Sequence, residues 1–192
     1  MTPRSTDKAP RKFKLKAKNQ KKGLILVFTG GGKGKTTAAL GTAMRAMGQG
    51  MSVAMVQFIK GAWKTGELKS AKKFGKKFDV FTMGEGFTWN TQNFDRDVAT
   101  AQKAWKKCCQ LMHDKKHQLI ILDEINYCMA YGFLKPKEVI KQLMKKPANK
   151  HVILTGNKAP KAILHISDLV TEMRSQKHPY DRGIVAQAGI DF

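Results

Sequence analysis

The sequence predicts an α/β protein in which a mostly parallel β-sheet carries helices on both faces. Two observations indicate this class. Short apolar runs with β character alternate with helical patterns from residue 23 onward, and a glycine-rich loop directly follows the first apolar run. The length of 192 residues, with 42% apolar side chains, suits one domain with its own core and would be cramped for two.

The elements follow one another in a regular order along the chain. Strand patterns fall at residues 24–29, 53–58, 78–82, 119–122, 151–155 and 168–173. Helical patterns fall at residues 36–47, 95–114, 137–145 and 160–165. Parallel sheets of this kind bind their ligands at the carboxyl ends of the strands. The site is therefore expected just after Thr29, Phe58, Leu122 and Thr155.

The longest helical pattern, residues 95–114, has an apolar face that should pack on the sheet. This face consists of Val98, Ala101, Trp105, Cys108 and Met112. Near its end lie His113 and His117, but the residues between them lack the glutamate of the zinc-protease motif. We therefore expect the two histidines to form a solvated helix end.

Residues 1–22 form a segment of their own. They hold nine Lys or Arg and one Asp, in a chain whose net charge is +22. The segment is polar and lacks convincing periodicity, so we expect a basic mobile arm followed by one domain over residues 23–192. The domain keeps a charge of +14, and a field of this size attracts anions such as nucleotides, nucleic acids and acidic membranes.

The sequence contains no targeting or membrane segment of a recognisable kind. No apolar run approaches the ~18 residues that span a bilayer, and no apolar stretch precedes Gly23 as a secretory signal would require. Cys108, Cys109 and Cys128 form no C-x-x-C pair, which favours small buried side chains over a disulfide framework or a zinc site. We expect a cytoplasmic protein with no membrane partner.

A glycine-rich loop joins the first strand to the first helix. It consists of Gly30, Gly31, Gly32, Lys33, Gly34, Lys35, Thr36 and Thr37. Glycines allow backbone N–H groups to curl around an anion, the helix N-terminus adds a partial positive charge, and Lys35 adds a full one. Thr36 is placed to ligate Mg²⁺ through its hydroxyl. The loop is a compact variant of the phosphate-binding motif, because Thr29 stands where the strict template has glycine.

A pair of acidic residues supplies the second half of a nucleotide site. Asp123 and Glu124 directly follow the apolar run 119–122. Carboxylates at the end of such a strand can hold Mg²⁺ directly or through water, which completes the neutralisation of a polyphosphate. Two acids in this place are also common at a helix N-terminus, but the glycine loop favours the metal role. The sequence therefore predicts a P-loop nucleotide site.

The segment 84–93 contains two large aromatic residues, Phe87 and Trp89, flanked by glycines and without helical spacing. In an arbitrary protein, such rings would most simply anchor a loop on the core. ATP binding alone does not specify the reaction, so the function depends on which other motifs accompany this segment.

Six segments between residue 23 and the C-terminus carry a resemblance to a known family. In chain order they are FTGGGKGKTTAALG, VQFIKGAWKTGE, GFTWNTQN, LIILDEINY, DLVTEM and KHPYDRGIVAQAGIDF. Together they resemble the P-loop family of ATP:corrinoid adenosyltransferases, and GFTWNTQN is the most specific of them. The resemblance implies a RecA-like P-loop NTPase fold, a homodimer and Mg-ATP. It also implies a corrinoid substrate that is reduced to Co(I) by a separate electron donor such as a flavodoxin.

The resemblance also implies roles for individual residues. Residues 30–37 would hold the triphosphate, Thr36 and Glu124 would ligate the metal, and Phe87 with Trp89 would lie against the corrin. In this family the Co(I) corrinoid is itself the nucleophile that attacks C5′ of ATP and expels tripolyphosphate, in the biosynthesis or salvage of adenosylcobalamin.

The protein's own tasks are then positioning and charge neutralisation, so Lys35, Thr36 and Glu124 would be the catalytic groups. Two positions depart from the family pattern. Gly31 stands where asparagine is usual, and Asn157 stands where arginine is usual. Each departure removes a polar or charged group near the nucleotide.

Two other functions are compatible with parts of the sequence. A P-loop kinase or ATPase would transfer the γ-phosphoryl group and release ADP instead of tripolyphosphate. A basic nucleic-acid-binding protein with ATP as a switch would use the positive charge and stack bases on its aromatic rings, which a salt titration with DNA or RNA would detect. The combined motifs favour the adenosyltransferase over both.

Overall fold

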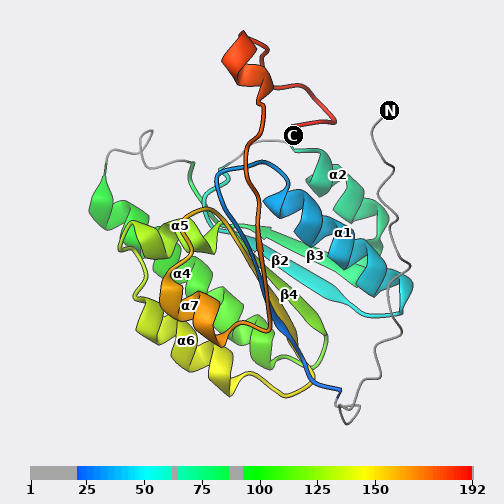
Figure 1. Cartoon of the computed structure of the whole chain (residues 1–192). Coiled ribbons are helices and arrows are strands. Elements are labelled where there is room, and N and C mark those ends of the chain that lie inside the picture. Colours follow the sequence, from blue (N-terminus) through cyan, green and yellow to red (C-terminus); the bar gives the residue numbers. More distant parts are fainter. Residues whose placement is uncertain (1–20, 62–64, 87–92, 192) are drawn as a thin grey trace, which may run out of the picture.

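The computed structural model describes residues 21–61, 65–86 and 93–191 (Figure 1). Within these ranges, six strands form one sheet in the order β3-β2-β4-β5-β1-β6, and every pairing is parallel. The strands are β1 Ile25–Thr29, β2 Val53–Gln57, β3 Phe78–Thr82, β4 Leu119–Asp123, β5 His151–Thr155 and β6 Leu169–Glu172. Each predicted strand is therefore confirmed to within two residues at either end.

Helices cover both faces of the sheet (Figure 1). They are α1 Lys35–Gly48, α2 Gly66–Lys73, α4 Phe94–His113, α5 Ile125–Ala130, α6 Pro136–Lys145 and α7 Lys161–Ile166, with 3₁₀ turns at Gly75–Lys77 and Pro179–Arg182. Helices α1 and α2 lie on one face, and α4, α6 and α7 on the other. The predicted α/β class is thus confirmed. Helices α2 and α5 were not predicted, because neither has a narrow apolar stripe: α2 buries only Ala71, while the short α5 buries Ile125, Asn126, Cys128 and Met129.

The core is split by the sheet into two apolar layers. Strands β2 and β4 are buried at every position, as expected for central strands of a sheet covered on both faces. The apolar face of α4 packs as predicted: Ala101, Cys108 and Met112 are buried, and Val98 and Trp105 lie against the same cluster. Among the described helices, none is long and apolar enough to cross a membrane.

The burial of the three cysteines agrees with the sequence expectation in two cases. Cys108 and Cys128 are buried, while Cys109 is half-buried, and all three are free thiols. Burial raises the pKa of the Cys128 thiol to about 12, so this side chain acts as a small apolar group and not as a reactive one.

The expectation of a solvated helix end is correct for His113 and wrong for His117. His113 is exposed, but His117 is 3% exposed because Asp79 and Asp114 approach its ring from both sides. Its Nδ1 lies 2.5 Å from Oδ2 of Asp114, and its Nε2 lies 2.9 Å from Oδ2 of Asp79. The buried Lys150 adds a bond of 3.0 Å to Oδ1 of Asp114. This cluster joins β3, β4 and β5 where the three strands begin.

Acid is expected to weaken this cluster. Burial alone would raise the pKa of Asp114, but hydrogen bonds from His117 and Lys150 outweigh it, so the pKa lies below its ordinary value of 3.8. Stability from Asp114 is therefore present above about pH 4 and is lost as the pH falls through the lowered pKa. Urea unfolding should show that Asp114→Asn costs about 1 kcal/mol at pH 7 and much less at pH 3.

The exposed Asp181 serves as the control, since Asp181→Asn should leave the free energy of unfolding unchanged at pH 7. If Asp114→Asn lowers the free energy of unfolding equally at pH 7 and pH 3, the stabilising role of the Asp114 charge is contradicted.

Candidate functional site

The candidate site lies at the carboxyl edge of the sheet. Strand β5 separates β1 from β4, so Thr155 lies between the glycine loop that follows β1 and the acidic pair at the end of β4. The structure brings Thr36, Asp123 and Thr155 into direct contact at this edge. These segments meet where the sequence places the ligand.

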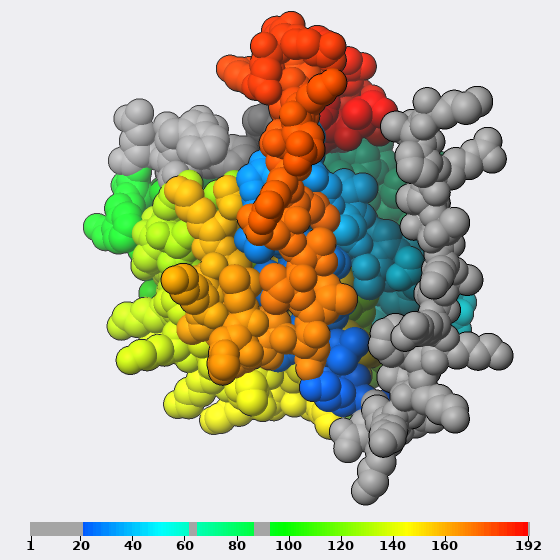
Figure 2. Space-filling view, in the orientation of Figure 1, coloured from blue at the N-terminus to red at the C-terminus, as the bar shows by residue number. Residues whose placement is uncertain are grey.

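The glycine loop is shaped by the segment that follows β6. Gly30 has φ 99°, and a Cβ there would lie only 2.3 Å from the carbonyl oxygen of Met173. The amide of Gly32 donates to the same oxygen at 2.8 Å. Figure 2 shows this orange segment on the surface beside the blue residues of the first strand and loop. The loop conformation thus depends on glycine at position 30 and on contact with residues far along the chain.

The two lysines of the loop have different environments. Nζ of Lys35 donates to the carbonyl oxygen of Gly32 at 2.7 Å, so the ammonium is folded over the loop. Lys33 is half-exposed and forms an ion pair with Asp191 near the C-terminus. Helix α1 begins at Lys35, directly after the glycines of the loop. The N–H groups of its first turn carry the partial positive charge of a helix N-terminus. The loop therefore combines backbone donors with the ammonium group that anion binding requires.

Asp123 links the glycine loop to two strands. It is fully buried, and its Oδ1 accepts hydrogen bonds of 2.8 Å from the hydroxyls of both Thr36 and Thr155. The hydroxyl of Thr155 in turn accepts from the amide of Glu124 at 2.9 Å. Because the Thr36 hydroxyl donates its proton to Asp123, its oxygen lone pairs remain available to a metal ion.

Two buried carboxylate oxygens have no hydrogen-bond partner among the described residues, namely Oδ2 of Asp123 and Oε2 of Glu124. A buried carboxylate oxygen without a partner is costly, and hard divalent cations with oxygen ligands relieve this cost. Together with the Thr36 hydroxyl, these atoms fit a Mg²⁺ ion that also contacts a polyphosphate. The donor set is therefore suited to the metal that the sequence predicts.

Glu124 has an unusual backbone conformation and an unusual pKa. Its backbone φ is 66°, in the left-handed region that residues other than glycine rarely adopt. Burial, followed by the charge of Asp123, raises the pKa of its carboxyl from 4.5 to about 7. A left-handed backbone and a raised pKa are both common at ligand-binding sites. Neither property was evident from the sequence.

Sequence reasoning missed Lys60 and Glu67 as contributors to the site, and it gave Thr155 only as a strand end beside the site. Lys60 follows β2, and its Nζ lies 3.9 Å from Oδ2 of Asp123 and 2.6 Å from Oε1 of Glu67. The position of Lys60 just after a strand end was the available signal, but its partners are distant in the sequence.

Two predicted groups remain to be placed. Phe87 and Trp89 lie outside the described residues. The two departures from the family pattern are neighbours in space, since a Cβ on Gly31 would lie 3.9 Å from Nδ2 of Asn157. Both departures therefore affect one side of the loop.

Comparisons with known proteins agree with the motifs. The family model described as ATP:corrinoid adenosyltransferase BtuR/CobO/CobP matches residues 21–192. A corrinoid adenosyltransferase of Sinorhizobium sp is 46% identical over 187 residues, which cover 96% of this chain and 87% of that protein. The corrinoid adenosyltransferase of Escherichia coli K12 is 44% identical over 171 residues, which cover 89% and 86% of the two chains.

A solved structure shares the fold. The flagellar accessory protein FlaH from Methanocaldococcus jannaschii matches with a TM-score of 0.50 and 13% identity, over 79% of this chain and 71% of that one. At this identity the likeness concerns the fold alone.

Proposed function

The chain belongs to the ATP:corrinoid adenosyltransferase family, and on this premise we propose that it transfers the 5′-deoxyadenosyl group of ATP to the Co(I) of a corrinoid and releases tripolyphosphate. The product serves the biosynthesis or salvage of adenosylcobalamin. The observation that carries the proposal for this chain's own residues is the hydrogen bond between Thr36 and Asp123, because it joins the phosphate loop to the end of β4.

In this proposal ATP binds along the carboxyl edge of the sheet. Residues 30–37 cradle the triphosphate, with backbone donors, Lys33 and Lys35 facing the phosphates. The position of Lys35 over the loop supports this role. Lys33 would exchange its contact with Asp191 for a phosphate, and the C-terminal segment would then be free to shift.

Mg²⁺ is proposed to bind between the loop and β4. Thr36 and Glu124 would be its ligands, and Asp123 would orient Thr36 and add negative charge, directly or through water. The unpartnered oxygens of Asp123 and Glu124 support this placement. The ion would supply positive charge to the triphosphate as it leaves.

The protein's contribution to the reaction is orientation and charge neutralisation. The C5′–O bond of ATP breaks and its electron pair leaves with the triphosphate, while the electron pair of the Co(I) substrate forms the new bond to C5′. Holding the two substrates in line can contribute roughly 7–11 kcal/mol to lowering the barrier. Lys35 and the loop amides stabilise the charge that develops on the leaving oxygen.

Other parts of the chain are proposed to serve the corrinoid. Phe87 and Trp89 would lie against the corrin and exclude water or a lower ligand, which makes reduction to Co(I) easier. Residues 1–22 would form an arm over the corrinoid site, in a homodimer of the cytoplasm that receives electrons from a donor such as flavodoxin. The match of the family model over residues 21–192 supports one domain after the arm.

The products distinguish this function from phosphoryl transfer. With ATP, Mg²⁺ and chemically reduced cobalamin, each light-sensitive carbon–cobalt product should appear together with one tripolyphosphate and without ADP. Ion-exchange chromatography of the phosphate products, run beside the absorbance change, measures this ratio. ADP in proportion to turnover would instead place the chain among kinases or ATPases.

A further inference from the structure

Lys60 occupies a central place at the site although it belongs to neither of its two nucleotide motifs. It follows β2, the strand between β3 and β4, and comes directly after the buried Phe58 and Ile59. Its ammonium lies 2.6 Å from Oε1 of Glu67 and 3.9 Å from Oδ2 of Asp123. The lysine therefore bridges the first turn of α2 and the end of β4.

The contact with Asp123 involves the carboxylate oxygen that has no hydrogen bond. Oδ1 of Asp123 is occupied by the hydroxyls of Thr36 and Thr155, while Oδ2 is buried without a hydrogen-bond partner among the residues described. Among the described residues, Lys60 is the basic side chain that forms an ion pair with Asp123. A buried charge is stable only when it is compensated, so this ammonium supports the carboxylate that holds Thr36.

Glu67 restricts where the ammonium can go. Its side chain is 11% exposed, against 29% for Lys60, so the acid is the more firmly buried partner of the two. The Glu67 carboxylate also accepts a hydrogen bond of 3.4 Å from Nε2 of Gln57. Oε1 of Gln57 in turn accepts a hydrogen bond of 2.9 Å from the hydroxyl of Thr82. The lysine is thus anchored to the polar ends of β2 and β3.

We infer that Lys60 is a positioning residue for the metal side of the ATP site: anchored by Glu67, it compensates the buried charge of Asp123 and so keeps the Thr36 hydroxyl oriented toward the metal. This inference rests on the proposed function, because it assumes that Thr36 serves Mg-ATP. It assigns a role to the VQFIKGAWKTGE segment that neither the phosphate loop nor the acidic pair explains.

Calorimetric binding of ATP, with and without Mg²⁺ and without any corrinoid, tests the inference. Lys60→Met should reduce the gain in ATP affinity that Mg²⁺ provides by about tenfold, and Lys60→Arg should restore most of it. In an Asp123→Asn background, Lys60→Met should have less than about a twofold further effect, because residues that act through one contact are not additive. The exposed Lys69 on α2 supplies the control, and Lys69→Met should change nothing.

Two results would overturn the inference. An equal loss of affinity with and without Mg²⁺ would make Lys60 a direct phosphate contact, and full additivity with Asp123→Asn would show that it does not act through Asp123. If Lys60→Met does not fold, Glu67→Gln keeps the ammonium but loosens its anchor, and should give a smaller loss of the Mg²⁺-dependent gain. A wild type that binds Mg-ATP in this way but fails to alkylate reduced corrinoid would refute the proposed function and leave the inference intact.

Discussion

Lys35→Ala is expected to lower kcat/KM for adenosyl transfer by roughly 10²–10³-fold while the fold is retained. The ammonium lies against the backbone of the glycine loop, where it donates to the carbonyl oxygen of Gly32 at 2.7 Å. Under the proposed function, its removal takes away charge that would stabilise the departing triphosphate. The same side chain lies outside the two buried apolar clusters, so the free energy of unfolding should change by less than about 0.5 kcal/mol.

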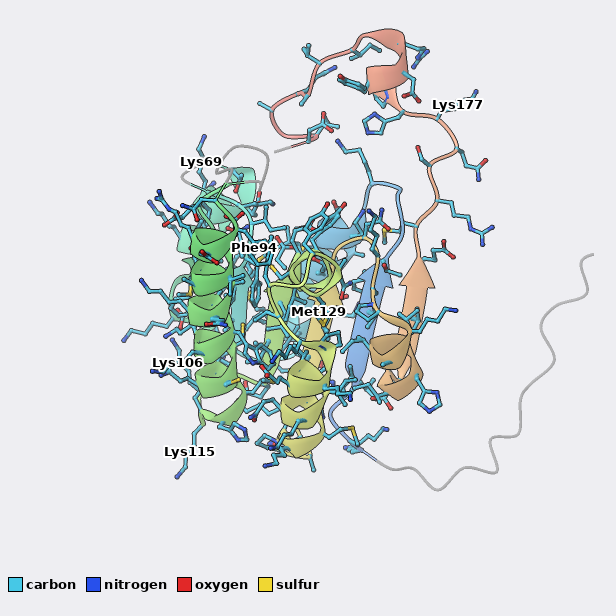
Figure 3. All side chains as sticks on the ribbon, turned by 90° about the vertical axis from the view of Figure 1, so that its left-hand side faces the viewer. Lys69, Phe94, Lys106, Lys115, Met129 and Lys177 are labelled. Atoms are coloured by element: carbon cyan, nitrogen blue, oxygen red, sulfur yellow. The ribbon has the colours of Figure 1, made fainter. Side chains whose placement is uncertain are left out.

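The absorbance of the carbon–cobalt product measures the first effect, and thermal melting followed by circular dichroism measures the second. Lys115 is a suitable control, because it is an exposed lysine at the end of the molecule opposite to Lys177 (Figure 3). Lys115→Ala should keep full activity. Normal turnover in a folded Lys35→Ala protein would refute the assignment of the phosphate loop.

Glu124→Gln is expected to abolish Mg²⁺-dependent turnover and yet to stabilise the ligand-free protein. The folded-state pKa of Glu124 is raised from 4.5 to about 7, first by burial and then by the charge of Asp123. A carboxyl whose pKa is raised on folding stabilises the protein below pH 4.5, and this contribution is lost as the pH rises through about 7. At pH 8 the wild type therefore carries a cost of roughly 2–3 kcal/mol, which the uncharged glutamine removes.

Urea unfolding at pH 5 and pH 8 tests this sign. The gain from Glu124→Gln should be present at pH 8 and small at pH 5, while Glu138→Gln on the exposed side of α6 should show no gain at either. Saturating Mg-ATP should stabilise the wild type more than the variant, because the metal compensates the Glu124 charge that only the wild type carries. A variant that is less stable than the wild type at pH 8 would contradict the account of Glu124.

Part of the positive charge of the chain lies on exposed lysines of the described residues. Lys106 and Lys115 lie along the outer side of α4 and the turn after it, and Lys69 lies on α2 (Figure 3). These side chains point into solvent, which is typical of a charged surface that keeps a protein soluble and attracts anions over a distance. The charge thus favours the approach of ATP without identifying the reaction.

The strands and the glycine-rich loop between β1 and α1 could be predicted from the sequence because their signals are contiguous. The apolar run of β4 is buried at all five positions, so its composition alone predicts a central strand. The loop depends on glycines and Lys35 within a few residues of one another, and its location between a strand and a helix is equally local. Helix α5 gave no such signal, because its buried residues do not form a single narrow apolar stripe.

The sequence by itself determined the α/β class, the strand positions, the position of the glycine loop and the family, because each depends on neighbouring residues or on motifs in a fixed order. Only the tertiary structure decided which of these parts meet. Thr36 and Asp123 are 87 positions apart, and Asp123 and Thr155 are 32 apart, yet the strand order places them in contact. The same long-range packing buried His117, brought Lys60 to Asp123 and raised the pKa of Glu124. These effects depend on burial and on distant charges, which arise only when the whole core has packed.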